Sequence, residues 1–301
     1  MAVRLRRKKR WYVIAARPVT TVGLPLDVAT GAAAAYSTRK LRTAYAGAAI
    51  NVRRSSDSTA QDIGFVGNSF DAASFTSFIG GGNGFEAIAY DQSGNANNMA
   101  QATAANQCQV QQTLAFYAPN SAQGDIKFLA APDAAPIQNI FATGGLVALV
   151  LSSAGVGFVN SIASKTAWVL FSYAGGGGPG NPSQFYFEVK AATTNGVWPS
   201  VETFTAASKH VITLAWNAAT PTVAPVITVD GGAPFTFSGY TLPVGAITSD
   251  VGGNLELFND QMINANNSAF GGTIYEAVFY KSIPSNQAAL ITSMKSFYGI
   301  P

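Results

Sequence analysis

The sequence predicts a mostly β fold, an antiparallel jelly-roll sandwich of two sheets, from three observations. From about residue 144 onward, short runs rich in Val, Ile, Phe, Tyr and Thr are separated by Gly, Pro and Asn. No helical segments separate these runs, which argues against a parallel sheet. The chain has 301 residues and is 48% hydrophobic, so it can bury one large core or two small ones.

The composition indicates where such a protein works. Charged residues make up 11% of the chain, against roughly 25% in an ordinary soluble domain. A surface that is hydrated through amides and hydroxyls rather than charges is typical of a β-rich extracellular or virion protein. Cys108 is the single cysteine, so no intrachain disulfide can form. This favours assembly in a reducing cytoplasm, even if the product later acts outside the cell.

Residues 1–30 are predicted to form an extended N-terminal arm, with Pro18 and Pro25 as breakers. The run "RLRRKKR" at 4–10 holds six of the 18 basic residues; the other 12 face 15 acidic residues, so the body is slightly acidic. The arm is either a solvated tail or an anchor on an acidic protein surface, and nucleic-acid or membrane contact is less favoured. The docking residues would be Arg4, Arg6, Arg7, Lys8, Lys9 and Arg10, with Trp11 and Tyr12 as apolar anchors.

Neither a membrane span nor a secretory leader is predicted. The apolar stretch "WYVIAA" after the basic run ends at Arg17, which is too short for a leader's apolar core. No window of about 18 apolar residues exists.

The elements follow in chain order. Residues 31–47 are predicted to be helical because alanine dominates them, and Gly47 would end the helix. Asp230 and Gly231 in "VDGG" predict a hairpin turn. A closing helix is predicted from Ser285 to Gly299, with an apolar stripe along one side. Seven strands are predicted, at 146–152, 167–174, 185–191, 210–216, 225–231, 254–259 and 273–280.

Two blocks of the first third resemble a known family. They are "AYSTRKLRTAYAGAAINVRRSSDSTAQDIGF" at 35–65 and "AIAYDQSGNANNMAQA" at 87–102. Together they resemble the opening of the α-L-arabinofuranosidase B catalytic domain, where "S-T-R-x-L", "V-R-R-S-S-D" and "Y-D-Q-S-G-N" occur in this order. The resemblance implies a jelly roll of the same kind.

A second block, from His210 to Gly299, is similar to the second half of a laminin-G or concanavalin A-like jelly roll. It carries "HVITLAWN", "ITVDGG" and "GGTIYEAVFYKSIPSNQAALI", and Gly272 to Ala277 echo the arabinofuranosidase ending "G-T-F-Y-E-G". The predicted organisation is therefore a basic arm at 1–30 and one concanavalin A-like sandwich at 31–301. Its first part, 31–130, is arabinofuranosidase-like, and its second part, 131–301, is laminin-G-like.

The resemblance implies a retaining glycosidase pair, a nucleophilic Glu in "D-L-E-N" and an acid/base Asp in "G-G-D-N-S-N". The nearest counterparts are Glu188 in "FYFEVKA" and Asp260 in "LFNDQMINANNS". Tyr186 and Val189 stand where the family has Asp and Asn, Asp260 lies too far from the last strand, and the family's vicinal cysteine pair is absent. These departures favour a non-catalytic protein, with Glu188 facing outward from an alternating strand.

Sugar binding without cleavage remains open. Asp91 in "YDQSGN" is interpreted mainly as a turn residue that bonds nearby backbone, with ligand contact as the alternative. Sugar recognition uses aromatic rings and amide or carboxylate groups. The candidates are Asp91, Asn95, Trp198, Tyr240, Asn259 and Asp260. No metal site and no cofactor are predicted, because the only histidine, His210, has no cysteine or second histidine beside it.

Three functions remain in competition. The first is a non-catalytic structural or adhesion protein of a tailed-phage virion, made in the host cytoplasm. It would dock on other capsid or tail proteins through its arm, be oligomeric in the particle, and display a lectin-like sandwich to host carbohydrate. The second is an α-L-arabinofuranosidase or related retaining glycosidase. The third is a free-standing lectin.

Overall fold

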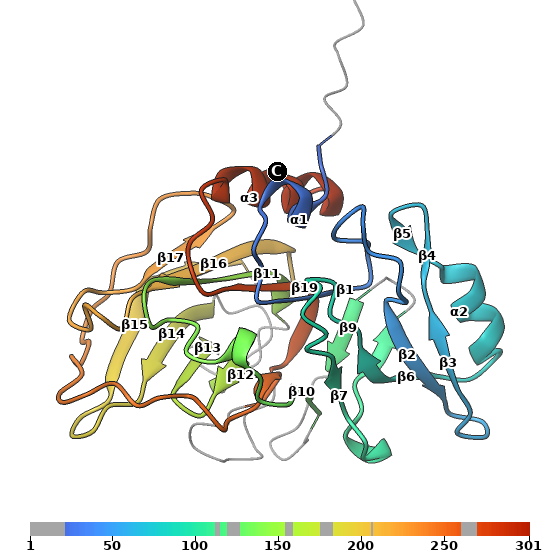
Figure 1. Ribbon diagram of the computed structural model, residues 1–301, viewed down its shortest axis with the longest axis horizontal. Helices are drawn as coiled ribbons and strands as arrows, with labels where there is room; N and C mark the ends of the chain where they lie inside the picture. Colours follow the sequence, from blue (N-terminus) through green and yellow to red (C-terminus); the bar gives the residue numbers. More distant parts are fainter. Residues whose placement is uncertain are drawn as a thin grey trace, which may run out of the picture.

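A computed structural model describes residues 22–111, 115–118, 127–153, 159–174, 183–205, 207–259 and 270–301. The basic segment with Arg4 to Tyr12 lies outside these residues, as does Asp260. Figure 1 shows two layers of antiparallel strands with two helices lying together above them. The predicted sandwich is therefore confirmed.

The back sheet lies under the helices. Its strands follow one another in space in an order unlike their order in the chain, which is typical of a jelly roll. Each pairs antiparallel with the next. The order is β17 (Val226–Val229), β16 (His210–Trp216), β11 (Gly145–Ser153), β19 (Gly272–Tyr280) and β1 (Ala34–Ser37).

The front sheet forms the other layer and is also antiparallel. In spatial order its strands are β15 (Gly196–Phe204), β14 (Ser183–Val189), β13 (Trp168–Ala174), β12 (Val159–Lys165), β18 (Leu255–Leu257), β10 (Leu129–Ala131), β7 (Met99–Ala100) and β6 (Gly84–Ala89). Shorter strands connect the layers within the first third: β2 (Ile50–Arg54), β3 (Ala60–Ile63), β8 (Gln109–Gln111) and β9 (Ala115–Ala118).

The remaining elements are short. They are α1 (Pro25–Val28), the β4 (Phe65–Val66) and β5 (Ser69–Phe70) hairpin, α2 (Ala72–Ile79), the 3₁₀ turns η1 (Ala104–Asn106) and η2 (Ala135–Ile137), and α3 (Gln287–Tyr298). Among the described residues, none of these helices is long and apolar enough to cross a membrane.

Two buried clusters result from this layering. The larger lies between the sheets and combines side chains such as Leu149 and Ile212 of the back sheet with Leu170 and Phe187 of the front sheet. The smaller covers the outer face of the back sheet, where Leu290 of α3 and its neighbours pack on the strands. No helix of the described residues lies over the outer face of the front sheet (Figure 1), although Val169 and Glu256 on that face are buried.

All seven predicted strands exist, with ends that differ by a few residues. The predicted hairpin turn also exists, with φ of 56° at Asp230 and 73° at Gly231, as a type I′ turn requires. The closing helix exists and ends at Gly299, which has φ of 66°. Its N-cap is Asn286 rather than Ser285.

The predicted helix over 31–47 is wrong. Residues Ala34–Ser37 instead form β1, which pairs with β19, and no helix follows before β2. All four residues of β1 are buried. Alanine's helix propensity amounts to only a few tenths of a kcal/mol per residue, so pairing and burial against β19 outweigh it.

Candidate functional site

The loop at 91–98 uses its polar groups on the chain itself. Asp91 is buried, and its Oδ1 accepts hydrogen bonds from Ala35 N at 2.9 Å and Ser93 N at 2.8 Å. Its Oδ2 accepts from Ser93 Oγ at 2.8 Å and Asn97 N at 2.9 Å. Four donors therefore surround this carboxylate, and the structural role expected for Asp91 accounts for all of them.

The same loop fixes the segment from Ala32 to Leu41. Asn95 donates through Nδ2 to the carbonyls of Ala32 and Ala33, at 3.0 and 2.9 Å. Gln92 has no exposed surface; it donates to the carbonyl of Ser37 at 2.8 Å and accepts from Leu41 N at 2.8 Å. The side chains proposed for sugar contact here thus satisfy backbone groups of β1 and its flanks.

A buried ion pair joins the two blocks that resemble known families. Arg39 of "STRKL" donates through Nε to Glu276 Oε2 at 2.6 Å and through Nη2 to Oε1 at 3.1 Å. Arg39 is 3% exposed and Glu276 is fully buried. The guanidinium also lies 4.5 Å from the ring centroid of Phe297 in α3. These motif residues therefore bind β1, β19 and α3 to one another.

Glu188 lies on the outer face of the front sheet. In β14 its neighbours Phe187 and Val189 point inward and are buried, while Glu188 is half-buried on the opposite face, as the alternation predicts. Asn195 donates through Nδ2 to Glu188 Oε1 at 3.1 Å, which orients the carboxylate.

Glu256 shares this face and was not singled out in the sequence. Its neighbours Leu255 and Leu257 belong to the core between the sheets, so Glu256 points the other way. Its side chain is 4% exposed, and Asn259 donates to its Oε2 at 2.8 Å. Strand alternation in "NLELFN" was the signal that could have found it.

The two glutamates stand in one row across the sheet. Paired residues place Glu188 opposite Val169, Val169 opposite Ser164, and Ser164 opposite Glu256. Three steps of about 4.8 Å between strands separate their backbones by about 14 Å. A retaining glycosidase needs carboxyl groups about 5–5.5 Å apart, so Glu256 is not positioned as the partner of Glu188.

The remaining sugar-binding candidates lie in different environments. Trp198 is completely buried, between the rings of Phe187 and Trp216 at centroid distances of 6.0 and 5.8 Å, so no ring surface is open to a sugar. Tyr240 is 53% exposed, on the segment that lies beside β15. Asn259 follows β18 and holds Glu256, as described above.

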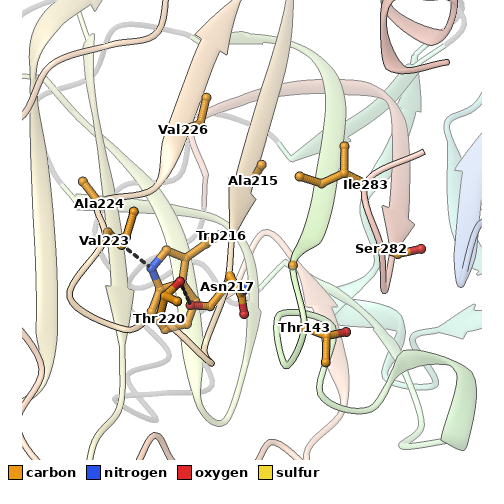
Figure 2. A pocket seen from close by; sticks show the side chains of 11 residues that line it. Thr143, Ala215, Trp216, Asn217, Thr220, Val223, Ala224, Val226, Ser282 and Ile283 are labelled. Atoms are coloured by element: carbon orange, nitrogen blue, oxygen red, sulfur yellow. Dashed lines mark hydrogen bonds between the residues drawn. The ribbon is translucent and has the colours of Figure 1, made fainter. Parts of the chain in front are cut away.

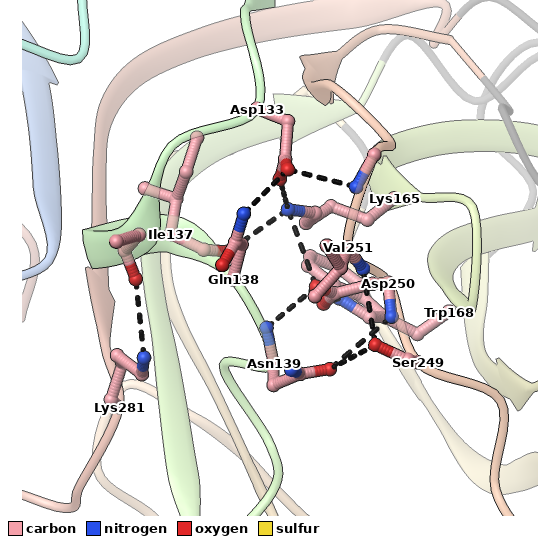
Figure 3. Close-up of polar contacts among 12 residues, drawn as sticks. Asp133, Ile137, Gln138, Asn139, Lys165, Trp168, Ser249, Asp250, Val251 and Lys281 are labelled. Carbon is pink, nitrogen blue, oxygen red and sulfur yellow. Dashed lines mark hydrogen bonds and ion pairs between the residues drawn. The ribbon is translucent and has the colours of Figure 1, made fainter.

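An ionic cluster supports the end of the front sheet (Figure 3). Lys165, at the end of β12, is fully buried; its Nζ lies 3.1 Å from Asp133 Oδ1 and 3.3 Å from Asp250 Oδ1, and donates to the carbonyl of Ile137 at 3.0 Å. Burial opposes ionisation of Asp133, but bonds from Gly252, Gln138 and Lys165 outweigh it and lower the pKa of Asp133. Each charge in this cluster has partners, which indicates a structural role.

Glu86 is a second buried acid, in a different environment. Both its carboxyl oxygens lack a hydrogen-bond partner within the described part of the chain, although the side chain has no exposed surface. Burial raises the pKa of Glu86 well above its ordinary value, and burial also raises the pKa of the neighbouring Cys108 thiol. Burial without a partner thus favours the neutral form of the Glu86 carboxyl.

Metal binding has no support in the described part of the chain. Among residues 22–111, 115–118, 127–153, 159–174, 183–205, 207–259 and 270–301, no group of three or more His, Cys, Asp or Glu side chains could hold a metal ion.

Comparison with known proteins supports the fold and the similarity of the chain to arabinofuranosidases. Residues 26–145 match the family model of the α-L-arabinofuranosidase B catalytic domain, which is less than half of the chain. No curated protein matches the chain in sequence.

Solved structures extend the similarity to most of the chain. A GH54 α-L-arabinofuranosidase soaked with a cyclic sulfate inhibitor superposes with a TM-score of 0.60 at 17% identity, over 89% of this chain and 65% of that one. An arabinofuranosidase complexed with arabinofuranosyl-α-1,2-xylobiose gives 0.57 at 17% identity, with the same coverage.

A mutant GH54 enzyme soaked with 4-nitrophenyl α-L-arabinofuranoside gives a TM-score of 0.58 at 15% identity, again over 89% of this chain and 65% of that one. The chain thus spans about two thirds of the length of these structures, and it has an arabinofuranosidase-like β-sandwich fold.

Proposed function

We propose that the protein is a glycoside hydrolase of the α-L-arabinofuranosidase type, acting at the outer face of the front sheet. The observation that carries the proposal is the agreement of two comparisons: the catalytic-domain family model matches residues 26–145, and GH54 enzymes share the fold over 89% of the chain. This favours catalysis over the purely adhesive function that the altered motifs suggested.

Within this proposal Glu188 is the nucleophile. It lies on the outer face of the front sheet, is half-buried, and has its carboxylate oriented by Asn195. A retaining mechanism has the nucleophile attack the anomeric carbon while a carboxylic acid about 5–5.5 Å away protonates the leaving oxygen. The same acid, once ionised, then activates water to release the sugar. Asp260 is the proposed acid/base, on the sequence alone.

Hydrolysis of 4-nitrophenyl α-L-arabinofuranoside tests the assignment. The wild type should release nitrophenol, Asp260→Asn should lower kcat by about 10²- to 10⁴-fold, and Glu188→Gln should lower it at least as far. Glu256→Gln is the matched control, because it makes the same change in the same row of the same face. An inactive wild type that still binds arabinofuranosyl-xylobiose would show the lectin function instead. Full activity in Glu188→Gln would exclude Glu188 as the nucleophile.

We also propose, on a separate observation, that the basic segment attaches the protein to a larger assembly such as a tailed-phage virion. Six of 18 basic residues fall within 4–10, while the rest of the chain carries 12 basic and 15 acidic residues. Such a segment suits an acidic capsid or tail surface. Host carbohydrate would be a further partner, bound by the sandwich. Deleting residues 2–12 should abolish incorporation into particles and leave the thermal midpoint of the body unchanged; normal incorporation would exclude the docking role.

A further inference from the structure

A cavity of about 380 Å³ opens on the outer side of the back sheet, away from the front-sheet face that carries Glu188. Figure 2 shows Val223 and Ala224 on one side of it, Ile283 and Ser282 on the other, and Ala215 between. Ala215 belongs to the cluster that α3 covers, but α3 begins only at Gln287, after this wall. The size falls within the range of about 300–1,000 Å³ for small-molecule sites.

Hydrogen bonds fix both walls in place. The loop between β16 and β17 is held by Trp216 Nε1, which donates to the carbonyl of Val223 at 3.1 Å, and by Val223 N, which donates to that of Thr220 at 3.0 Å. The opposite wall is joined to the floor by Ile283 N, which donates to the carbonyl of Gly144 at 3.1 Å. Gly144 has φ of 106°, a conformation open mainly to glycine. The cavity is therefore preformed.

The lining defines the chemistry of its ligand. None of the lining residues carries a charge, and the walls expose apolar side chains: Val223 is 59%, Ile283 48% and Val226 45% exposed. Large apolar side chains that are this exposed to solvent beside a cavity indicate an apolar ligand.

Four side chains of the lining are polar, those of Thr143, Asn217, Thr220 and Ser282, and Asn217 is the amide among them. Asn217 accepts from Ala219 N through Oδ1 at 2.9 Å, while its Nδ2 has no hydrogen-bond partner among the described residues. This amide can donate to a carbonyl or ester oxygen. Apolar side chains outnumber polar ones in the lining, which favours an apolar ligand over a sugar, and an anion would need a cation that the lining lacks.

We propose that this cavity is a second binding site, separate from the outer face of the front sheet that carries Glu188. Its ligand is a neutral aromatic or aliphatic molecule with a carbonyl or ester acceptor. The apolar walls hold the hydrocarbon part, and Asn217 Nδ2 donates to the oxygen. The site lies on the other sheet from Glu188, so it does not depend on the proposed hydrolase activity.

Calorimetric titration with methyl cinnamate tests the proposal, with the cinnamate anion and arabinose as comparison ligands. We expect saturable binding of one methyl cinnamate per chain, at least tenfold weaker binding of cinnamate, and no binding of arabinose to this site. Ala224→Trp fills the mouth of the cavity from an exposed position and should weaken methyl cinnamate binding at least tenfold.

Two further variants complete the design. Val66→Trp makes a similar enlargement at a 66% exposed position on the β4–β5 hairpin and should leave the affinity within twofold of the wild type. Asn217→Asp keeps the acceptor for Ala219 N but replaces the donor with an anion, and should weaken binding several-fold. Absent binding, equal affinity in Ala224→Trp, or a preference for arabinose or cinnamate would each overturn the assignment. Equal unfolding midpoints for both tryptophan variants confirm that the comparison is made on folded protein.

Discussion

The loop at 91–98 and strand β14 are both rich in polar side chains, but they use them differently. In the loop, the carboxylate of Asp91 accepts four hydrogen bonds from the chain, and Asn95 and Gln92 also bond backbone groups. In β14, Glu188 stands half-buried on the outer face of the front sheet. The motifs shared with arabinofuranosidases therefore lie where the fold is held together, whereas Glu188, the proposed nucleophile, stands in a strand that departs from the family's motif.

The largest change in the free energy of unfolding is expected when the ion pair of Arg39 and Glu276 is broken. Arg39→Met should lower the free energy of unfolding by about 3–5 kcal/mol, because it leaves a buried carboxylate without its partner. Urea unfolding measures the change. The double variant Arg39→Met, Glu276→Leu should recover most of the loss, because it removes both charges together. A double variant as unstable as the single one would mean that the pair acts through something other than charge.

The next largest effect is expected for Asp91→Ala. It should lower the free energy of unfolding by about 3 kcal/mol, because four donors lose their acceptor and some of them remain buried. Asp57→Ala is the matched control from the same third of the chain. Asp57 is 47% exposed and pairs with Arg54 at the surface, so its loss should lower the free energy of unfolding much less than the loss of Asp91. Equal losses in the two variants would remove the distinction drawn between the loop and the surface.

Glu86→Gln should raise the free energy of unfolding at neutral pH relative to the wild type. Because burial raises the pKa of Glu86, the folded state keeps a proton that the unfolded chain releases above a pH of about 4.3. The free energy of unfolding therefore falls as pH rises from there to the folded-state pKa, by up to about 1.4 kcal/mol per unit. The variant should show a flatter pH dependence and nearly wild-type stability at pH 4. Unfolding midpoints from pH 4 to 9 measure both.

The smallest effect is expected at Tyr240. This side chain is 53% exposed, so Tyr240→Ala should change the free energy of unfolding by less than about 0.5 kcal/mol. Trp198→Ala, at the completely buried candidate, should cost about 3–5 kcal/mol. Chemical denaturation of both variants compares them, and a large loss at Tyr240 would mean that its ring packs against the body.

The sequence predicted strands where strand propensity and burial agree, as in Leu146 to Leu151. It failed at Ala34 to Ser37, because only pairing with β19, more than 230 residues away, makes that alanine run extended. It also missed β12 and β15, whose Ser, Asn, Gly and Pro residues weaken the strand pattern. Local patterns cannot report such distant pairings.

The candidate site shows the same limit. Alternation correctly placed Glu188 outward between Phe187 and Val189. It could not show that Trp198 is covered on both sides by rings from other strands, or that Glu256 stands in the same row as Glu188. Those facts depend on sheet order, which the sequence alone does not specify.

The contact between Arg39 and Glu276 has a consequence for how the protein is made. The two residues are 237 positions apart, so a ribosome adding about 5–20 residues per second needs about 10–50 s between them. Throughout that interval β1 has no β19 to pair with, and the guanidinium of Arg39 remains hydrated. Completion of the back sheet must therefore wait until β19 has been synthesised, and nascent chains that stall before residue 276 should be substrates for chaperones.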